Sequence, residues 1–126
     1  MNKIELLKLV DSLNLPKEDY FILSGGSLLL MGLREATNDL DIGITKNGFE
    51  TLKQSYSVEM KNQERQQYAI TDKIECIIVE KLDSDITYID NYPCESLISI
   101  YNFKKRVNRE KDQADILAIK KVLNIK

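Results

Sequence analysis

Two short stretches of the chain combine residue types that are suited to phosphate and metal chemistry. Ser24-Gly25-Gly26-Ser27 follows a short apolar run, and Asp39-Leu40-Asp41 stands after a second apolar run. Glycines let backbone N–H groups approach an anion closely, and the first turn of a following helix carries positive partial charge. Paired carboxylates bind divalent cations. Together the two stretches predict phosphoryl or nucleotidyl transfer.

The glycine stretch is expected to form a turn between a strand, 20–23, and a helix, 28–33. An ordinary tight turn before a helix has the same composition, so that alternative stays open. The stretch is not a P-loop, because no Gly-Lys-Ser/Thr follows it, and it lacks the third glycine of the dinucleotide fingerprint. Another basic side chain must therefore neutralise a bound triphosphate.

The acidic stretch alternates polar and apolar residues over 39–44, which is the period of a strand with one face toward a core. Asp39 and Asp41 then point the same way, with their α-carbons roughly 6 to 7 Å apart. Two acids on one face are costly unless a cation or solvent compensates them. The sequence predicts a divalent metal there, and a simply exposed strand face is the alternative.

A third acid stands inside the β-branched segment 73–79, where Glu75 interrupts an apolar run. Burying an unpaired carboxylate costs several kcal/mol, so this residue is seldom placed there for stability. We expect Glu75 to lie on the strand beside Asp39 and Asp41, to bind the metal and to accept a proton from an attacking hydroxyl. Asp72, in the turn before this strand, is the second choice. An edge strand with Glu75 facing water is the alternative.

These motifs resemble the DNA polymerase beta-like nucleotidyltransferase superfamily, and within it AbiEii-type abortive-infection toxins and small antibiotic nucleotidyltransferases. The resemblance covers about 21 to 123. It lacks the additional substrate domain of larger relatives, has Glu75 where aspartate is commoner, and has one additional residue between arginine and threonine. The matching segments are Gly25-Gly26-Ser27, Gly32-Leu33-Arg34-Glu35-Ala36-Thr37-Asn38-Asp39-Leu40-Asp41, Lys104, and Arg109-Glu110-Lys111-Asp112-Gln113-Ala114-Asp115-Ile116.

The resemblance implies a Mg²⁺-dependent enzyme that moves a nucleoside monophosphate from a nucleoside triphosphate to a hydroxyl acceptor and releases pyrophosphate. The acceptor would be an antibiotic, a tRNA or a protein. A catalytically silent nucleotide-binding or toxin–antitoxin partner module with the same fold is the alternative. An antitoxin or a second copy of the chain is a possible partner. The implied roles are metal binding by Asp39, Asp41 and Glu75, phosphate binding by Gly25, Gly26 and the Ser27 hydroxyl, and charge neutralisation by Arg34, Lys104 and Lys111.

The length and composition of the chain indicate a single domain that needs no disulfides. The 126 residues are 43% hydrophobic and 30% charged, which suffices for one domain, 1–126, that buries a core without disulfides. Cys76 and Cys94 lack metal-type spacing and are expected to be reduced core thiols. No stretch reaches the roughly 20 apolar residues that a bilayer requires, and the N-terminus does not have the pattern of an export signal. We therefore expect a cytoplasmic protein.

Charge and periodicity complete the prediction. The net charge is −2, yet 101–126 holds eight basic residues against three acidic ones, a net charge of +5, on a solvated helix face or facing an anionic substrate. Tyr101 and Phe103 are expected to pack in the core rather than to stack on bases. The expected fold is α+β, a small mixed sheet flanked by helices, with C-terminal helices. We expect helices at 4–13, 28–33, 48–56, 93–103 and 114–123, and strands at 20–23, 39–44, 57–60, 68–70 and 73–79.

Overall fold

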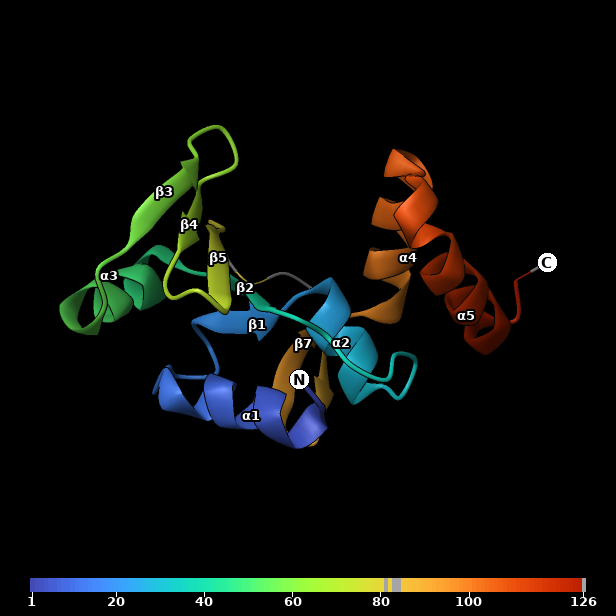
Figure 1. The fold of residues 1–126 in the computed structure, drawn as a ribbon, viewed down its shortest axis with the longest axis horizontal. Helices are drawn as coiled ribbons and strands as arrows, with labels where there is room; N and C mark the ends of the chain where they lie inside the picture. The colour runs from blue at the N-terminus through green and yellow to red at the C-terminus, as the bar shows by residue number, and fades with distance from the viewer. Residues whose placement is uncertain (81, 83–84, 126) are drawn as a thin grey trace.

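A seven-stranded mixed sheet forms the centre of the computed structural model, which describes residues 1–80, 82 and 85–125 (Figure 1). Lys126, counted above in the basic segment, lies outside them. The helices are α1 (Lys3–Ser12), α2 (Ser24–Leu30), α3 (Lys46–Ser55), α4 (Leu97–Val107), the 3-10 helix η1 (Glu110–Asp112) and α5 (Gln113–Leu123). The strands are β1 (Tyr20–Ile22), β2 (Leu40–Ile44), β3 (Glu59–Asn62), β4 (Gln67–Ala69), β5 (Ile74–Ile78), β6 (Ile86–Ile89) and β7 (Tyr92–Glu95).

The acid-bearing strand β2 is the middle strand of the sheet, whose order is β3-β4-β5-β2-β1-β7-β6. It runs parallel to β5 and antiparallel to β1, and β1 runs parallel to β7. Parallel and antiparallel pairs therefore occur side by side, and the α+β class expected from the sequence is confirmed.

The alternation of β2 sends its apolar side chains into the main core. Leu40, Ile42 and Ile44 are fully buried, whereas Asp41 next to Leu40 and Ile42 is only partly covered. Helices α1 and α3 supply much of the rest of this core, and each begins at a side-chain cap, Asn2 for α1 and Thr45 for α3. One face of β2 is thus anchored in the core, which leaves its acids on the other.

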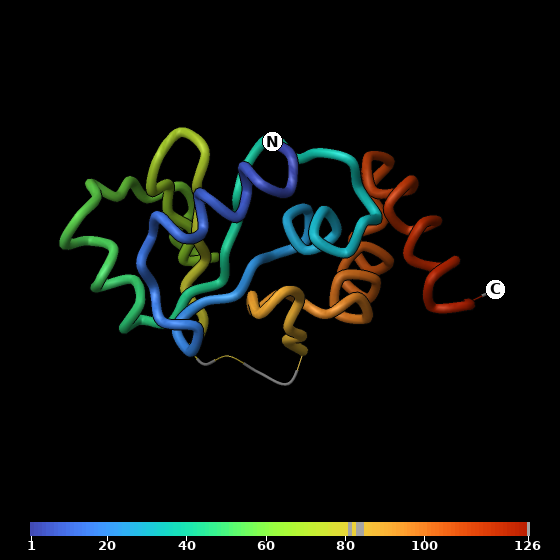
Figure 2. Tube along the Cα trace, turned by 90° about the horizontal axis from the view of Figure 1, so that it is seen from below, coloured from blue at the N-terminus to red at the C-terminus, as the bar shows by residue number. Residues whose placement is uncertain are grey.

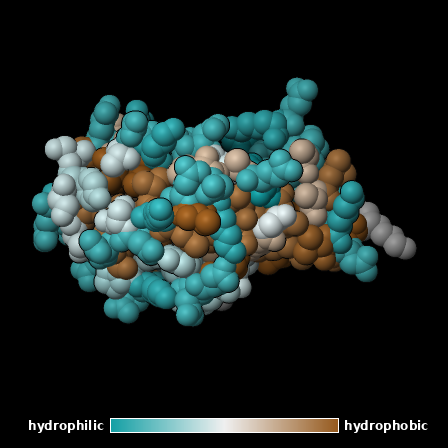
Figure 3. Space-filling model, turned by 60° about the horizontal axis from the view of Figure 1, so that its bottom comes forward, coloured by the Kyte–Doolittle hydropathy of each residue, from teal (hydrophilic) through white to brown (hydrophobic). Residues whose placement is uncertain are grey.

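The C-terminal helices α4 and α5 lie at the opposite end of the molecule from α3 and the β3–β4 hairpin (Figures 1 and 2). They have their own small apolar cluster, built on Leu28, Ile100 and Ile119. Leu117 and Val122 remain largely exposed, and apolar surface gathers toward the end of the molecule where the C-terminus lies (Figure 3). The cluster of Leu28, Ile100 and Ile119 packs α4 and α5 against α2.

Besides small shifts at the ends of other elements, two differences from the sequence prediction are larger: an unexpected hairpin of β6 and β7, and the start of α2. The helix expected from residue 93 begins only at Leu97, because Tyr92–Glu95 pairs with Ile86–Ile89 as a hairpin. Asp90 and Asn91 form its two-residue turn with positive φ values of 50° and 70°, which suits the twist of a tight hairpin. The other difference is α2, which begins at Ser24 rather than after the glycines.

Both cysteines are buried and free, as expected from their spacing. Burial raises the pKa of the Cys76 thiol to about 12 and that of the Cys94 thiol to about 11, so neither is a reactive thiolate near neutral pH. Within 1–80, 82 and 85–125, the helices are too short or too polar to cross a membrane.

Candidate active site

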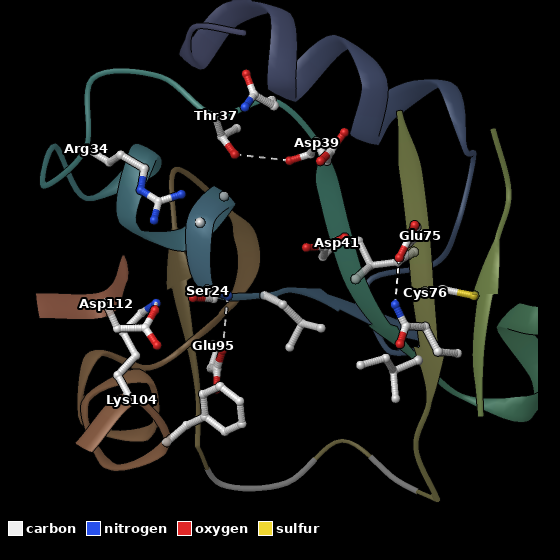
Figure 4. A pocket seen from close by; sticks show the side chains of 18 of the residues that line it. Ser24, Arg34, Thr37, Asp39, Asp41, Glu75, Cys76, Glu95, Lys104 and Asp112 are labelled. Carbon is white, nitrogen blue, oxygen red and sulfur yellow. Dashed lines mark hydrogen bonds and ion pairs between the residues drawn. The ribbon is translucent and has the colours of Figure 1, made fainter. Parts of the chain in front are cut away.

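A cavity of about 680 Å³ lies between the start of α2, the strands β2 and β5, and the segment α4–η1 (Figure 4). Its volume is in the usual range for small-molecule sites. Asp39 and Asp41 stand on one side of it, and Arg34, Lys104 and Asp112 stand on the other. Of the predicted site residues, the cavity brings together Gly25, Gly26, Arg34, Asp39, Asp41, Glu75, Lys104 and Lys111.

The acidic wall is built by strand register. Asp41 on β2 is the direct neighbour of Glu75 on the parallel strand β5, and Asp39 immediately precedes β2. Adjacent strands are about 4.8 Å apart, so the side chains of Asp41 and Glu75 start from neighbouring backbone positions. The structure places Asp72 in the bend before β5, outside the cavity lining. Geometry therefore favours Glu75 over Asp72 as the third acid.

The carboxylates repel one another. Partial burial of its carboxyl group raises the pKa of Asp41, and the charges of Glu75 and Asp39 raise it further. The Arg65 guanidinium, on the turn between β3 and β4, acts in the opposite direction but does not cancel them. The acidic wall thus carries negative charge that a bound cation would stabilise.

The donor set fits Mg²⁺ by its chemistry, since carboxylate oxygens are its usual protein ligands. Within the part of the chain that the structure describes, however, no three His, Cys, Asp or Glu side chains are close enough together to form a ready-made metal site. Glu75 Oε1 instead accepts a hydrogen bond from Gln67 Nε2 at 2.6 Å. Asp39 and Asp41 are therefore the first pair available to a metal, and Glu75 would join them through its second carboxylate oxygen or by exchanging its Gln67 contact.

The glycines lie in the first turn of α2, facing the acids across the cavity. A Cβ atom on Gly25 would come within 2.7 Å of Arg34 Nη1, and one on Gly26 within 2.6 Å of Ile22 Cγ2. Gly25 thus leaves room for the guanidinium beside the helix, and Gly26 lets α2 pack closely on β1. The first N–H groups of a helix have no partner within it. That of Ser24 is bonded to Glu95, which leaves those of Gly25 and Gly26 as the donors of this turn toward the cavity.

Ser27 is absent from the cavity lining. Its side chain is completely buried, and its hydroxyl donates a hydrogen bond of 2.8 Å to the Ile22 carbonyl. The phosphate-binding role expected for this hydroxyl is incompatible with that position, and Ser27 instead fastens α2 to β1.

Replacement of Ser27 by alanine tests this structural assignment. We expect Ser27→Ala to lower the free energy of unfolding by about 1–2 kcal/mol, because the buried Ile22 carbonyl loses its donor. Nucleotide affinity should stay unchanged. Urea denaturation and calorimetric titration measure the two quantities. Ser12→Ala is the matched control, because its hydroxyl donates a comparable bond to the Leu9 carbonyl at an exposed position. A stable variant with weakened nucleotide binding would return Ser27 to a phosphate-binding role.

The basic wall is a network of ion pairs rather than a set of free cations. Lys104 is 4% exposed, and its Nζ lies 2.8 Å from Asp112 and 3.4 Å from Asp115. Arg34 pairs with Asp115 at 2.6 Å, and Arg109 pairs with Asp112 at 2.7 Å. Three cations surround two carboxylates, so the network keeps an excess of positive charge on the side of the cavity opposite the acids.

The electrostatics of Asp112 follow from this network. Burial by itself would raise the pKa of its carboxyl group, but hydrogen bonds from Arg109 and Lys104 outweigh that effect and lower the pKa. Lys104 is consequently committed to Asp112 and Asp115, whereas Lys111 lines the cavity from an exposed position. The described residues form no ion pair with Lys111, so of the two predicted lysines it is the one whose charge is available to a ligand.

Several cavity residues were not predicted. Glu95 accepts the Ser24 N–H through Oε1 at 3.0 Å and the Ser99 hydroxyl through Oε2 at 2.9 Å, so it joins α2 to α4. Arg65, Gln67, Phe103 and Arg109 also line the cavity. No local pattern marks Gln67, because 61–67 is polar at every position, and nothing in the sequence places that run beside the acids.

Comparison with known proteins supports the fold. No protein-family model matches the chain, and no curated protein matches it significantly. A crystal structure of a "putative nucleotidyltransferase" from Thermotoga maritima matches with a TM-score of 0.57 and 18% sequence identity, over 100% of this chain and 97% of that one. The chain therefore has a nucleotidyltransferase-like fold.

Proposed function

We propose that this protein is a Mg²⁺-dependent nucleotidyltransferase that transfers a nucleoside monophosphate from a nucleoside triphosphate to a hydroxyl acceptor. The observation that carries the proposal is the cavity itself. Asp39, Asp41 and Glu75 line one side, and the first turn of α2 and the basic network line the other. A triphosphate needs donors and cations on one side and a metal-binding carboxylate wall on the other. The nucleotidyltransferase-like fold agrees with this arrangement.

The chain's own residues would divide the work as follows. The backbone N–H groups of Gly25 and Gly26 would hold the leaving phosphates, and Arg34 and Lys111 would offset their charge. Asp39 and Asp41 would hold Mg²⁺, with Glu75 beside them. When bound, Mg²⁺ supplies Lewis-acid stabilisation of the entering and leaving oxygens.

The group transfer also needs a base that takes the proton of the attacking hydroxyl. As the acceptor oxygen bonds to the α-phosphorus, the bond from that phosphorus to the pyrophosphate oxygen breaks. The hydroxyl proton passes to a carboxylate, for which Glu75 is our candidate because it lies beside Asp41 at the acidic wall. Its acceptance of a hydrogen bond from Gln67 keeps the carboxylate oriented before the acceptor arrives.

A nucleotide-binding module without turnover is the second candidate. The observation that favours it is the state of the acids: Glu75 is engaged by Gln67, and the described residues contain no assembled three-ligand metal site. For the enzyme, the acceptor that we propose is a hydroxyl of an antibiotic, a tRNA or a protein. The following experiment separates the two functions.

Pyrophosphate release from each of the four nucleoside triphosphates, with Mg²⁺ and cell extract as the acceptor source, tests the enzyme. We expect release with at least one triphosphate, and a nucleotide added to one acceptor class by mass spectrometry. Both signals should disappear in Asp39→Ala. Nucleotide binding without release would support the silent module, and absence of both binding and release would contradict both functions.

A further inference from the structure

Phe103 on α4 faces the cavity, in contrast to the sequence expectation that it packs in the core. Its neighbour Tyr101 packs against the apolar cluster around Ile100, as expected. Phe103 belongs to neither apolar cluster, is only partly buried, and lines the cavity beside Lys104. A half-buried ring on a cavity wall leaves apolar surface that a ligand can cover.

Two arginine side chains lie beside the Phe103 ring. The guanidinium carbons of Arg106 and Arg109 lie 5.6 and 5.8 Å from its centroid, within the range of cation–π attraction. Arg109 forms an ion pair with Asp112, which holds its guanidinium beside the ring. Phe103 is moreover the only aromatic side chain among the described residues that line the cavity. Any aromatic contact with a ligand must therefore come from this ring.

We propose that Phe103 is the stacking surface for the nucleobase of the bound nucleotide. The proposal rests on the nucleotidyltransferase function above and adds the place of the base. With the triphosphate held between the acids of β2 and β5 and the first turn of α2, the base is the end of the nucleotide that can extend to Phe103 on α4. Every nucleobase has an aromatic face, so stacking on Phe103 should change nucleotide affinity by about tenfold or more without selecting one base. The site should therefore prefer nucleotides over bare polyphosphate, with little discrimination among bases from this contact.

A single-tryptophan variant tests the contact directly. The chain contains no tryptophan, so Phe103→Trp introduces one fluorophore at the proposed stacking position. We expect ATP and GTP to quench its fluorescence in a saturable way, whereas inorganic tripolyphosphate should bind without comparable quenching. Tyr101→Trp is the matched control, because it places the fluorophore on the same helix in the packed cluster, where nucleotides should not quench it.

Binding measurements on the otherwise unaltered chain complete the test. Phe103→Leu keeps an apolar side chain and should weaken ATP affinity about tenfold or more. Its tripolyphosphate affinity and melting temperature should stay close to those of the unaltered protein. If ATP binds by calorimetry but neither quenches Phe103→Trp nor loses affinity in Phe103→Leu, the stacking proposal is wrong and the nucleotidyltransferase proposal stands. Equal quenching in Tyr101→Trp, or quenching by an acceptor alone, also overturns it. Failure of both ATP and tripolyphosphate to bind overturns both proposals.

Discussion

Asp41→Asn is expected to reduce pyrophosphate release by about 1,000-fold or more, the scale on which loss of a central catalytic group acts. Asp41 lies at the centre of the acidic wall, with Asp39 immediately before the same strand and Glu75 at the paired position of β5. An amide at this position keeps the size of the side chain but removes the negative charge that a metal requires. Initial rates with saturating Mg²⁺ and triphosphate measure the effect.

The same substitution should make the metal-free protein more stable. Partial burial and the neighbouring carboxylates raise the folded-state pKa of Asp41, so folding disfavours its charged form. Its stabilising contribution is fully present below the ordinary pKa of aspartate and is lost as pH rises through the raised folded-state value. The stability advantage of Asp41→Asn over the unaltered protein should therefore grow from acidic to neutral pH. Urea denaturation across that range, without divalent cations, measures it.

Asp72→Asn is the matched control for both measurements. Asp72 precedes the same strand as Glu75 but lies outside the cavity lining and is exposed. The Asp72→Asn variant should retain activity, and its stability advantage over the unaltered protein should not grow from acidic to neutral pH. Equal loss of activity in Asp72→Asn would contradict the choice of acids made here, and a destabilised Asp41→Asn would contradict the repulsion that the pKa of Asp41 indicates.

Asp112→Ala should have the largest effect on stability. Asp112 is 3% exposed and accepts hydrogen bonds from Lys104 and Arg109. Among the described residues, its removal leaves the buried Lys104 ammonium group with only the longer ion pair to Asp115. Breaking a buried pair in this way costs about 3–5 kcal/mol. Urea denaturation followed by circular dichroism measures the free energy of unfolding.

Glu110→Ala serves as the control for Asp112→Ala, because Glu110 lies in the same 3-10 helix and is exposed. We expect a change within about 0.5 kcal/mol for this surface substitution. A loss below about 1 kcal/mol in Asp112→Ala would show that the network is dispensable for folding. The double variant Lys104→Met with Asp112→Leu should recover part of the lost stability, since it removes both buried charges.

Much of the acidic wall could be predicted because strand periodicity is a local property. The alternation around Asp41 fixes which side chains share a face, and the apolar flanks of Glu75 mark an unusual acid. The structure places both in one cavity with Gly25 and Gly26. Their adjacency across β2 and β5 is a tertiary pairing, which the order of the acids suggested but local pattern alone did not determine.

The rest depended on contacts between distant parts of the chain. Ser27 looked like a phosphate ligand, yet the close packing of α2 on β1 turns its hydroxyl toward Ile22. The Asp90-Asn91 turn was a local hairpin signal, but the apolar residues after Pro93 were read as the start of a helix. Phe103 has the same helical spacing as a core residue, and only the position of α4 beside the cavity sets it apart.

The pair formed by Arg34 and Asp115 has a consequence for the order in which a growing chain acquires its site. These two residues are 81 positions apart, and the cavity wall extends from Leu23 to Asp112. Because domains form from the N-terminal side during synthesis, β1, β2 and β5 emerge from the ribosome well before α4 and η1. A nascent chain that has completed β5 therefore carries the acids and Arg34 without Lys104, Arg109 and Asp112, and the nucleotide binding proposed above must await the synthesis of α4 and η1.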